Sequence, residues 1–239
     1  SDNSIDKTNE IVEQFIKKHK EFNIRFYITK DHKGKTNAQN EAQKTVKSEI
    51  LVMTDANSIL KEDSIRSLVA SFSDDKIAYV CGKLVYVNKG ETNTADSESA
   101  YWNLDLKMRD IESRIFCITA GNGAIYACRN TLYYDFPPIE CHDSAMPTHY
   151  IANGNISLFN PSAIAYEKAG EVDADEFKRK VRMNRSLINA YKLSFKFMNL
   201  PKYGWFSLFY FGHRTCRYFL WLFHILAFVS TIWMFFLGS

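Results

Sequence analysis

The sequence lacks the patterns of several common protein classes. It contains no CxxC pair, and its five cysteines are odd in number and widely spread, so neither a zinc ribbon nor a disulfide framework is indicated. It shows no signal-peptide pattern, internal repeat or low-complexity linker. The net charge of +3 is too small to indicate a nucleic-acid partner. With 46% apolar and 24% charged residues, the chain is expected to form a globular body in a reducing compartment.

The C-terminal part holds one long run without formal charge, Tyr218 to Leu237. As a helix it would span the roughly 30 Å hydrocarbon core of a membrane. A buried hydrophobic helix is the alternative, but a domain of this size cannot easily cover a helix that is apolar on every face. His213, Arg214 and Arg217 precede the run, so the positive-inside rule places the bulk of the chain on the cytoplasmic side of the cell membrane.

The rest of the chain alternates between short apolar runs and amphipathic segments. This alternation predicts an α/β domain with a mostly parallel sheet flanked by helices. Strands are expected at Ile24–Thr29, Glu49–Thr54, Ile77–Val87, Ile156–Phe159 and Ala163–Tyr166, and a small-residue turn followed by a strand is expected in TAGNGAIYACR, Thr119 to Arg129. Helices are expected at Ile5–Phe22, Lys35–Lys47, Glu62–Phe72, Ser97–Phe116 and Asp173–Tyr191. The domain prediction is residues 1–195 for the cytosolic domain, 196–217 for an amphipathic interfacial segment and 218–237 for a transmembrane helix.

The stretch ILVMTDANSIL, Ile50 to Leu60, places an acid and an amide where a buried strand ends. In parallel α/β sheets, ligands gather outside the carboxyl ends of the strands. Asp55 and Asn57, two residues apart around a tight turn, can both face a divalent cation, which prefers oxygen ligands. The same residue types also end strands and start turns without any ligand. Both interpretations stay open at this point.

Two further segments are compatible with a phosphate site. Lys33-Gly34-Lys35 precedes a predicted helix, and a helix N-terminus with lysines attracts anions, although such a turn is often only a solvated loop. Gly121-Asn122-Gly123 is a small-residue turn that lets a ligand approach the backbone closely, or is simply a tight turn.

Seven short motifs occur in an order that resembles the family-2 glycosyltransferases of GT-A fold. The nearest likeness is to membrane-bound enzymes that build capsular, hyaluronan-like or other extracellular polysaccharides. The motifs are SDNSIDKT, KGKTNAQN, TDANS, VCGKLVY, GNGAIYACR, HDSAMP and KRKVRMNR, which cover the chain from Ser1 to about Asn189. The family's first strand has no counterpart here, so the domain is expected to be N-terminally incomplete.

The resemblance implies a donor site and a metal. Asp2 matches the turn that reads the nucleotide base or ribose, and Lys35 and Asn40 match a segment near the nucleotide. Asp55 and Asn57 match the DxD motif, whose acids hold Mg²⁺ or Mn²⁺ on the diphosphate. Because Asn57 replaces the second acid of that motif, the metal is expected to bind more weakly.

The resemblance also implies a base and a diphosphate clamp. Gly121, Asn122 and Gly123 match the loop that shapes the donor and acceptor pocket. Asp143 matches the general base, although an Asp at this place is otherwise a plausible helix cap. His142, which stands where an acid is common, would tune the pKa of Asp143.

The basic helix near the end of the domain has two interpretations. Arg179 and Arg182 match the position of QxxRW beside the diphosphate, although the segment lacks the Gln and Trp of that motif, which weakens any case for processive synthesis. The same cationic face would suit anionic lipid headgroups.

The leading prediction is therefore an inverting, metal-dependent hexosyltransferase at the membrane. It would move a sugar from a nucleotide-diphosphate sugar, expected to be a UDP-sugar, to a growing polysaccharide or glycan acceptor. Its partners would be the donor, the acceptor, membrane lipids and other membrane subunits, but no nucleic acid. The alternatives are non-processive transfer to a lipid-linked acceptor and a catalytically inactive GT-A-like subunit.

Overall fold

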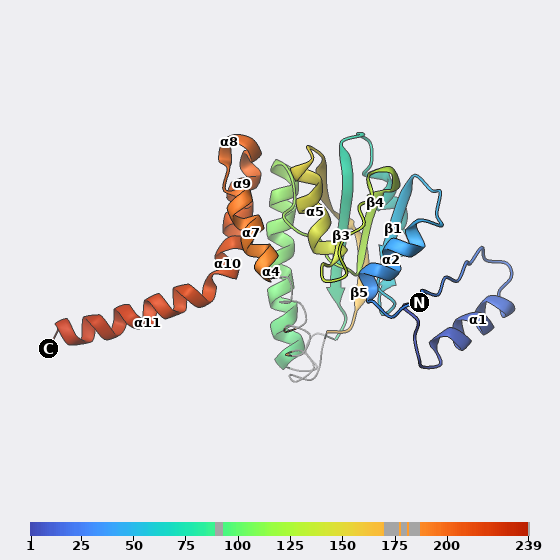
Figure 1. The fold of residues 1–239 in the computed structure, drawn as a ribbon, viewed down its shortest axis with the longest axis horizontal. Helices are drawn as coiled ribbons and strands as arrows, with labels where there is room; N and C mark the ends of the chain where they lie inside the picture. Colours follow the sequence, from blue (N-terminus) through green and yellow to red (C-terminus); the bar gives the residue numbers. More distant parts are fainter. Residues whose placement is uncertain (89–92, 170–176, 178–180, 182–186, 239) are drawn as a thin grey trace.

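The computed structural model describes residues 1–88, 93–169, 177, 181 and 187–238. A five-stranded sheet lies between helices, with the strand order β1-β4-β3-β5-β2 (Figure 1). The strands are β1 (Ile50–Thr54), β2 (Ile59–Leu60), β3 (Ile77–Tyr86), β4 (Ile125–Arg129) and β5 (Ile156–Glu167). The helices before the C-terminal segment are α1 (Thr8–Lys18), α2 (Lys35–Gln43), α3 (Ser64–Ala70), α4 (Asn93–Ile115), η1 (Asn130–Leu132) and α5 (His142–Ala152). The C-terminal segment, Leu187–Leu237, holds the helices α7 (Leu187–Phe197), α8 (Leu200–Tyr203), α9 (Trp205–Tyr210), η3 (Phe211–Thr215), α10 (Cys216–Tyr218) and α11 (Leu220–Leu237).

The sheet is mixed, and this corrects part of the predicted pattern. Strands β1, β3 and β5 run in one direction, as the α/β alternation predicts. Strand β4, however, enters antiparallel between β1 and β3, so β3 and β5 are the only parallel neighbours among the described strands. Strand β2 pairs antiparallel with the outer edge of β5. The α/β class is confirmed, whereas the mostly parallel pairing is wrong because β4 separates two strands of like direction.

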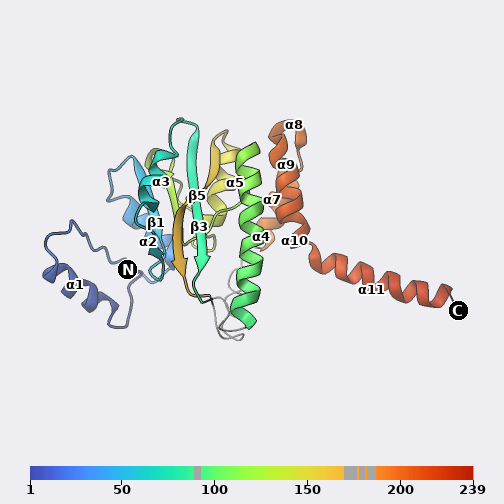
Figure 2. The same cartoon turned by 180° about the vertical axis from the view of Figure 1, so that it is seen from behind.

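Strand β3 forms the centre of the core and is covered on both faces. Tyr79 and Cys81 belong to one apolar cluster, and Val80 and Leu84 to another on the opposite face. This alternation follows the two-residue period of a strand. The first cluster packs against α5 and the second against α3 (Figure 2). A sheet buried on both faces is rigid, which suits a site built on its ends.

Two predicted strands do not appear as expected. Ile24–Thr29 forms no strand, because no described segment pairs with its backbone along its length; Tyr27 and Ile28 stay exposed. Ile156–Phe159 and Ala163–Tyr166 are joined in one strand, β5, with a register shift opposite Gly82. The shift falls at Asn160-Pro161, where proline removes a backbone donor from the ladder.

The two ends of the chain project from the sheet in opposite directions (Figures 1 and 2). Helix α1 forms within the predicted range, but none of its residues is buried. At the other end, α7 to α10 pack outside α4, and α11 extends away from the body. Helix α11 is long and apolar enough to cross a membrane, with a mean hydropathy of 2.0 and none of its length buried.

The close packing at Gly82 generates a stability prediction. A Cβ at this position would lie 2.6 Å from the carbonyl oxygen of Ala163 and 2.6 Å from Cγ2 of Ile125. Because the carbonyl belongs to the neighbouring strand and cannot rotate away, Gly82→Ala is expected to lower the free energy of unfolding by about 1–3 kcal/mol. Urea unfolding of the full chain in detergent measures this change.

Gly212→Ala provides the matched control, since a Cβ at Gly212 meets nothing within 4 Å. Its free energy of unfolding is expected to stay equal or to rise slightly, as alanine favours a helix over glycine. Equal stabilities for the two variants would show that the sheet tolerates a side chain at Gly82.

Candidate active site at the end of strand β1

The turn after β1 carries a paired carboxylate. Thr54 ends the strand by donating its hydroxyl to the carbonyl of Ala124, 2.8 Å away. The turn then closes through a hydrogen bond from the Ser58 amide to the Asp55 carbonyl. The half-buried carboxylate of Asp55 accepts a short ionic hydrogen bond from the ammonium of Lys35. The strand end and the first residue of α2 therefore meet at one point.

Lys35 is held in place by the loop that begins α2. Gly34 has a φ of 98°, a conformation that favours glycine. The carboxylate of Asp2 accepts hydrogen bonds from the backbone amides of Gly34 (2.8 Å) and Lys33 (3.2 Å). Asp2, predicted to read the base or ribose, thus lies beside the predicted site. In this structure its oxygens fix the loop that presents Lys35.

The predicted small-residue loop lies directly against the ion pair. A Cβ on Gly123 would come within 2.7 Å of Asp55 Oδ2 and 3.2 Å of Lys35 Nζ, so only glycine fits there without displacement. Asn122 is buried and binds the loop to the sheet, donating to the Gly82 carbonyl (2.8 Å) and accepting from the Ala124 amide (3.1 Å). Its side chain positions the loop rather than facing outward.

Asp143 joins the same site through the loop. Asp143 lies at the start of helix α5, and its backbone carbonyl accepts a 2.8 Å hydrogen bond from the amide of Gly121. Burial raises the pKa of the Asp143 carboxyl, the Lys35 ammonium opposes that rise and the Asp55 carboxylate adds to it. These influences place the three charged groups within electrostatic reach of one another. A carboxyl with a raised pKa next to a cation suits proton transfer.

The predicted nucleotide contact Asn40 lies in a buried network instead. Its side chain donates to the Phe136 carbonyl (2.9 Å) and accepts from the Tyr133 hydroxyl (3.0 Å), and it lies 2.9 Å from the His142 ring. Burial, with a smaller contribution from Lys35, lowers the pKa of His142 to about 4. His142 is therefore neutral at pH 7, and the charges that act on Asp143 come from Lys35, Asp55 and, to a smaller extent, Arg109.

Sequence reasoning missed Glu167, the last residue of β5. Ser58 donates its hydroxyl to the Glu167 carboxylate, and the Asn57 side chain also hydrogen-bonds it. Burial raises the pKa of Glu167, the two hydrogen bonds oppose this, and the Asp55 charge adds to it. The rule that ligands gather at the carboxyl ends of strands would have found this residue, because it directly follows the predicted strand Ala163–Tyr166.

These side chains fit a hard divalent cation. Asp55, Asn57 and Glu167 together offer two carboxylates and one amide, all oxygen donors of the kind that Mg²⁺ and Mn²⁺ prefer. The Lys35 ammonium on Asp55 shows that the site already attracts positive charge. No group of three or more His, Cys, Asp or Glu side chains forms a metal cluster within the described ranges. The predicted contacts Arg179 and Arg182 lie outside the described residues.

Comparisons with solved structures support the fold. The mannosyltransferase PcManGT from Pyrobaculum calidifontis, in complex with GDP-Man and Mn²⁺, is 18% identical with a TM-score of 0.63, and the match covers 79% of this chain and 52% of that one. TarS 1-349 from S. aureus, in complex with UDP-GlcNAc, is 15% identical with a TM-score of 0.54, and the match covers 83% and 56%. At these identities the likeness shows the GT-A fold alone. The match spans about half the length of both structures.

The sequence comparison assigns the chain more directly. A search of curated proteins gave no match. The family model described as Glycosyl transferase family 2 matches residues 1–134 of the 239, which includes Lys35, Asp55 and Gly123. Because this match extends over more than half of the chain and agrees with the fold, the chain belongs to glycosyl transferase family 2.

Proposed function

We propose that the chain transfers a sugar from a nucleotide-diphosphate sugar, a UDP-sugar in the first instance, to an acceptor hydroxyl with inversion. The observation that carries this proposal is the convergence of Lys35, Asp55 and Asp143 around the Gly121–Gly123 loop. The Lys35 ammonium, and a metal ion held by the Asp55 carboxylate, would bind the diphosphate. The Asp143 carboxylate would take the proton of the acceptor hydroxyl. The nucleotide sugars bound in the two solved structures support a donor of this class.

The residues divide into two roles. Lys35, with Arg179 and Arg182, would bind the diphosphate and offset the charge that develops as it leaves. Asp55, Asn57 and Glu167 would hold Mg²⁺ or Mn²⁺, which supplies Lewis-acid charge at the diphosphate when bound. Glycine at 123 leaves room for the donor to reach this pair.

Asp143 would act as the general base. As the acceptor oxygen attacks the anomeric carbon, the carboxylate takes the hydroxyl proton, and the bond from that carbon to the diphosphate breaks. A single displacement on the face opposite the leaving group inverts the anomeric centre. Only the ionised carboxylate can accept the proton, so activity is expected to fall as the pH drops through the raised pKa of Asp143.

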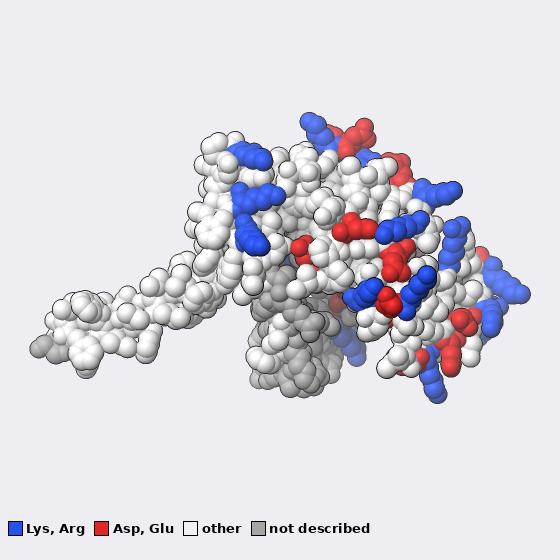
Figure 3. All heavy atoms as spheres, in the orientation of Figure 1, with Lys and Arg blue, Asp and Glu red and all other residues white. Residues whose placement is uncertain are grey.

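The reaction would take place at the cell membrane, with the catalytic domain on the cytoplasmic side. The support is α11, which carries no charged residue, and the lysines on α7 and α8, earlier in the same C-terminal segment (Figure 3). His213 and Arg214, which the sequence placed in the basic flank, are buried; Arg217 and Lys202 remain accessible. The acceptor would be a growing polysaccharide or glycan, or a lipid-linked acceptor. Lipids and other membrane subunits would be partners.

Asp143→Asn tests the catalytic role. Turnover, measured as UDP release from a panel of UDP-sugars with Mn²⁺, is expected to fall by about 10²–10⁴-fold because the base is removed. The Asp143→Asn variant is expected to fold. A raised carboxyl pKa means that the folded state favours the neutral form, an advantage present at low pH and lost as the pH rises through that pKa. At pH 7 the neutral amide should give an equal or higher unfolding midpoint.

Asp135→Asn is the matched control, since Asp135 is exposed and pairs with Lys44 outside the site. Its turnover should match that of the parent chain. Full activity of Asp143→Asn would exclude Asp143 as the base. Absence of nucleotide release by the parent chain from every UDP- and GDP-sugar tested would refute the proposed function and favour an inactive subunit.

Glu167→Gln tests the metal site without any turnover. In the presence of UDP, the Mn²⁺ affinity, measured from the paramagnetic resonance of free Mn²⁺, is expected to fall roughly tenfold or more. Asp55→Asn should have at least the same effect. Glu62→Gln, an exposed acid that follows β2 on the side away from Glu167, should leave the affinity unchanged. If Asp55→Asn weakens binding and Glu167→Gln does not, Glu167 is no part of the metal site.

A further inference from the structure

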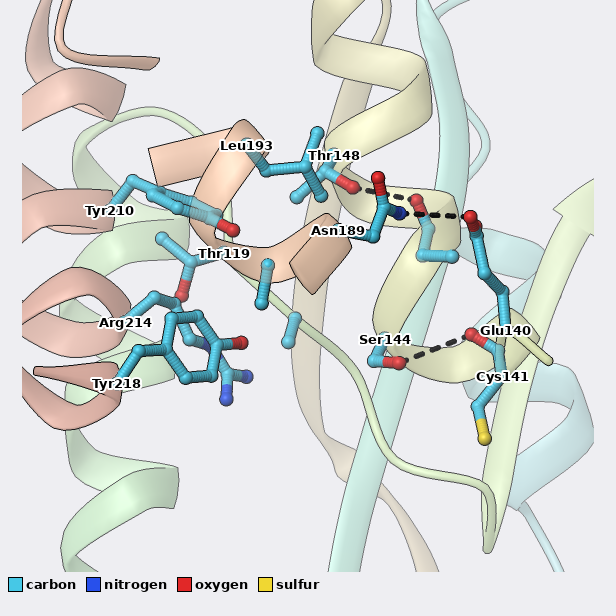
Figure 4. Close-up of a pocket in the computed structure, with 13 residues that line it drawn as sticks. Thr119, Glu140, Cys141, Ser144, Thr148, Asn189, Leu193, Tyr210, Arg214 and Tyr218 are labelled. Carbon is cyan, nitrogen blue, oxygen red and sulfur yellow. Dashed lines mark hydrogen bonds between the residues drawn. The ribbon is translucent and has the colours of Figure 1, made fainter. Parts of the chain in front are cut away.

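A cavity of about 60 Å³ lies between α5, α7 and the C-terminal segment (Figure 4). By a measure in which one water takes roughly 10–15 Å³, it has room for a phosphate-sized group. Its polar walls include Thr119, Ser144, Asn189, Tyr210, Arg214 and Tyr218. Ala120 and Ser144 also line it, and these residues neighbour Gly121 and Asp143. The cavity therefore shares walls with the proposed active site.

Arg214 brings a buried charge to this cavity. The residue is only 6% exposed, and Figure 4 shows its guanidinium directed into the cavity beside Tyr218. Its Nε is buried without a partner, and among the described residues no carboxylate lies within ion-pair distance of its guanidinium. Its charge still acts on Asp105 and helps to lower the pKa of that carboxyl. The nearby carboxylate of Asp105 is already bound by Arg109 (2.5 Å) and His213 (2.9 Å).

The unpaired Nε of Arg214 is costly to bury, and an oxyanion in the cavity would satisfy it. A buried charge without a hydrogen-bonded partner loses several kcal/mol of solvation. A guanidinium offers a planar set of donors that matches carboxylate and phosphate oxygens. Arg214 also lies on the π-helical turn η3, a rare backbone form that occurs frequently at functional sites.

The carboxylate of Glu140 also lines the cavity, and it does not fill the role of this anion. Figure 4 shows it across the cavity from Arg214, hydrogen-bonded by the Asn189 side chain at 2.8 Å. Burial raises the pKa of Glu140. The hydroxyl-bearing residues Thr119, Tyr210 and Tyr218 line the same cavity as Arg214.

We propose that this cavity binds a phosphate-type oxyanion carried by the acceptor, with Arg214 as its main ligand. The acceptor part of the inference rests on the proposed function, because it uses the position of Asp143. An anion held next to the start of α5 would orient the acceptor relative to that carboxylate. The ligand class is then an anionic acceptor, a phosphorylated lipid or a soluble phosphorylated glycan.

The structure gives a reason to test both sources. A second, apolar cavity of about 240 Å³ lies along the same C-terminal segment, and its walls include Phe211, Thr215 and Phe219. One arm of the experiment therefore uses inorganic phosphate and the other uses farnesyl phosphate, with uncharged farnesol as its control. Binding to the full chain in detergent micelles is measured by calorimetry and by ³¹P resonance line broadening.

Arg214→Gln is expected to weaken binding of at least one phosphate probe by roughly tenfold or more, the value of a charge-assisted hydrogen bond. Arg217→Gln removes the same charge three residues on, where the side chain binds the Tyr101 hydroxyl outside the cavity, and should change binding less than threefold. Both probes are titrated with UDP in excess, so that the donor site at Lys35 is filled and the measured binding reports this cavity. Binding of farnesyl phosphate alone identifies a lipid-borne anion, and binding of both probes equally identifies the phosphate itself.

Two results would overturn the inference: neither probe binds the parent chain, or Arg214→Gln binds both as the parent does. If Arg214→Gln does not fold, Ser144→Leu replaces it, because this residue enters the cavity from an exposed position and the larger side chain should occlude it. Unchanged binding in that variant would count equally against the cavity. Phosphate binding without sugar turnover would leave this inference standing and remove the proposed function, and the reverse result would do the opposite.

Discussion

The contact between Gly123 and the Lys35–Asp55 ion pair is the constraint on which the site depends. It brings together the end of β1, the start of α2 and the loop that precedes β4, segments far apart in the chain. Hydrogen bonds hold each partner in position. Asp2 binds the loop that carries Lys35, and the buried Asn122 binds the glycine loop to the sheet. A side chain at position 123 would displace both charged groups. The absence of a side chain at Gly123 therefore both leaves space for a ligand and allows Lys35 and Asp55 to meet.

A second buried carboxylate links this loop to the C-terminal segment. Glu112 of α4 accepts hydrogen bonds from the amide (3.0 Å) and hydroxyl (3.2 Å) of Thr119. The same carboxylate lies 2.7 Å from Nδ1 of His213 on η3. All three residues are buried, where such bonds are least screened by solvent. The segment that leads into α11 and the loop at the active site are thus held by one carboxylate, so a displacement of one is felt by the other.

Local pattern was enough to predict the elements that carry the proposed site residues. Asp55 follows a run of apolar residues at the end of β1, Lys35 starts α2, and Asp143 lies in the first turn of α5. The role expected of Asp143 came from the resemblance to the family, not from its neighbours. Long-range pairing was not predictable in this way. The entry of β4 between β1 and β3, the unpaired Ile24–Thr29 and the burial of Asn40 each depend on segments distant in the sequence. Pattern alone carries no information on such partners.

The position of Glu167 changes the interpretation of Asn57. Considered within its own motif, the amide removes one negative charge from a metal site and favours an inactive protein. In the fold, β2 pairs with β5 so that Ser58 faces Glu167, which brings that carboxylate to the Asn57 side chain. In the proposed metal site, Glu167 would then supply the negative charge that Asn57 lacks. A second acid at position 57 would stand against Glu167 and add repulsion between like charges. The amide, which donates to one carboxylate and still offers an oxygen to a cation, is the side chain that this arrangement favours.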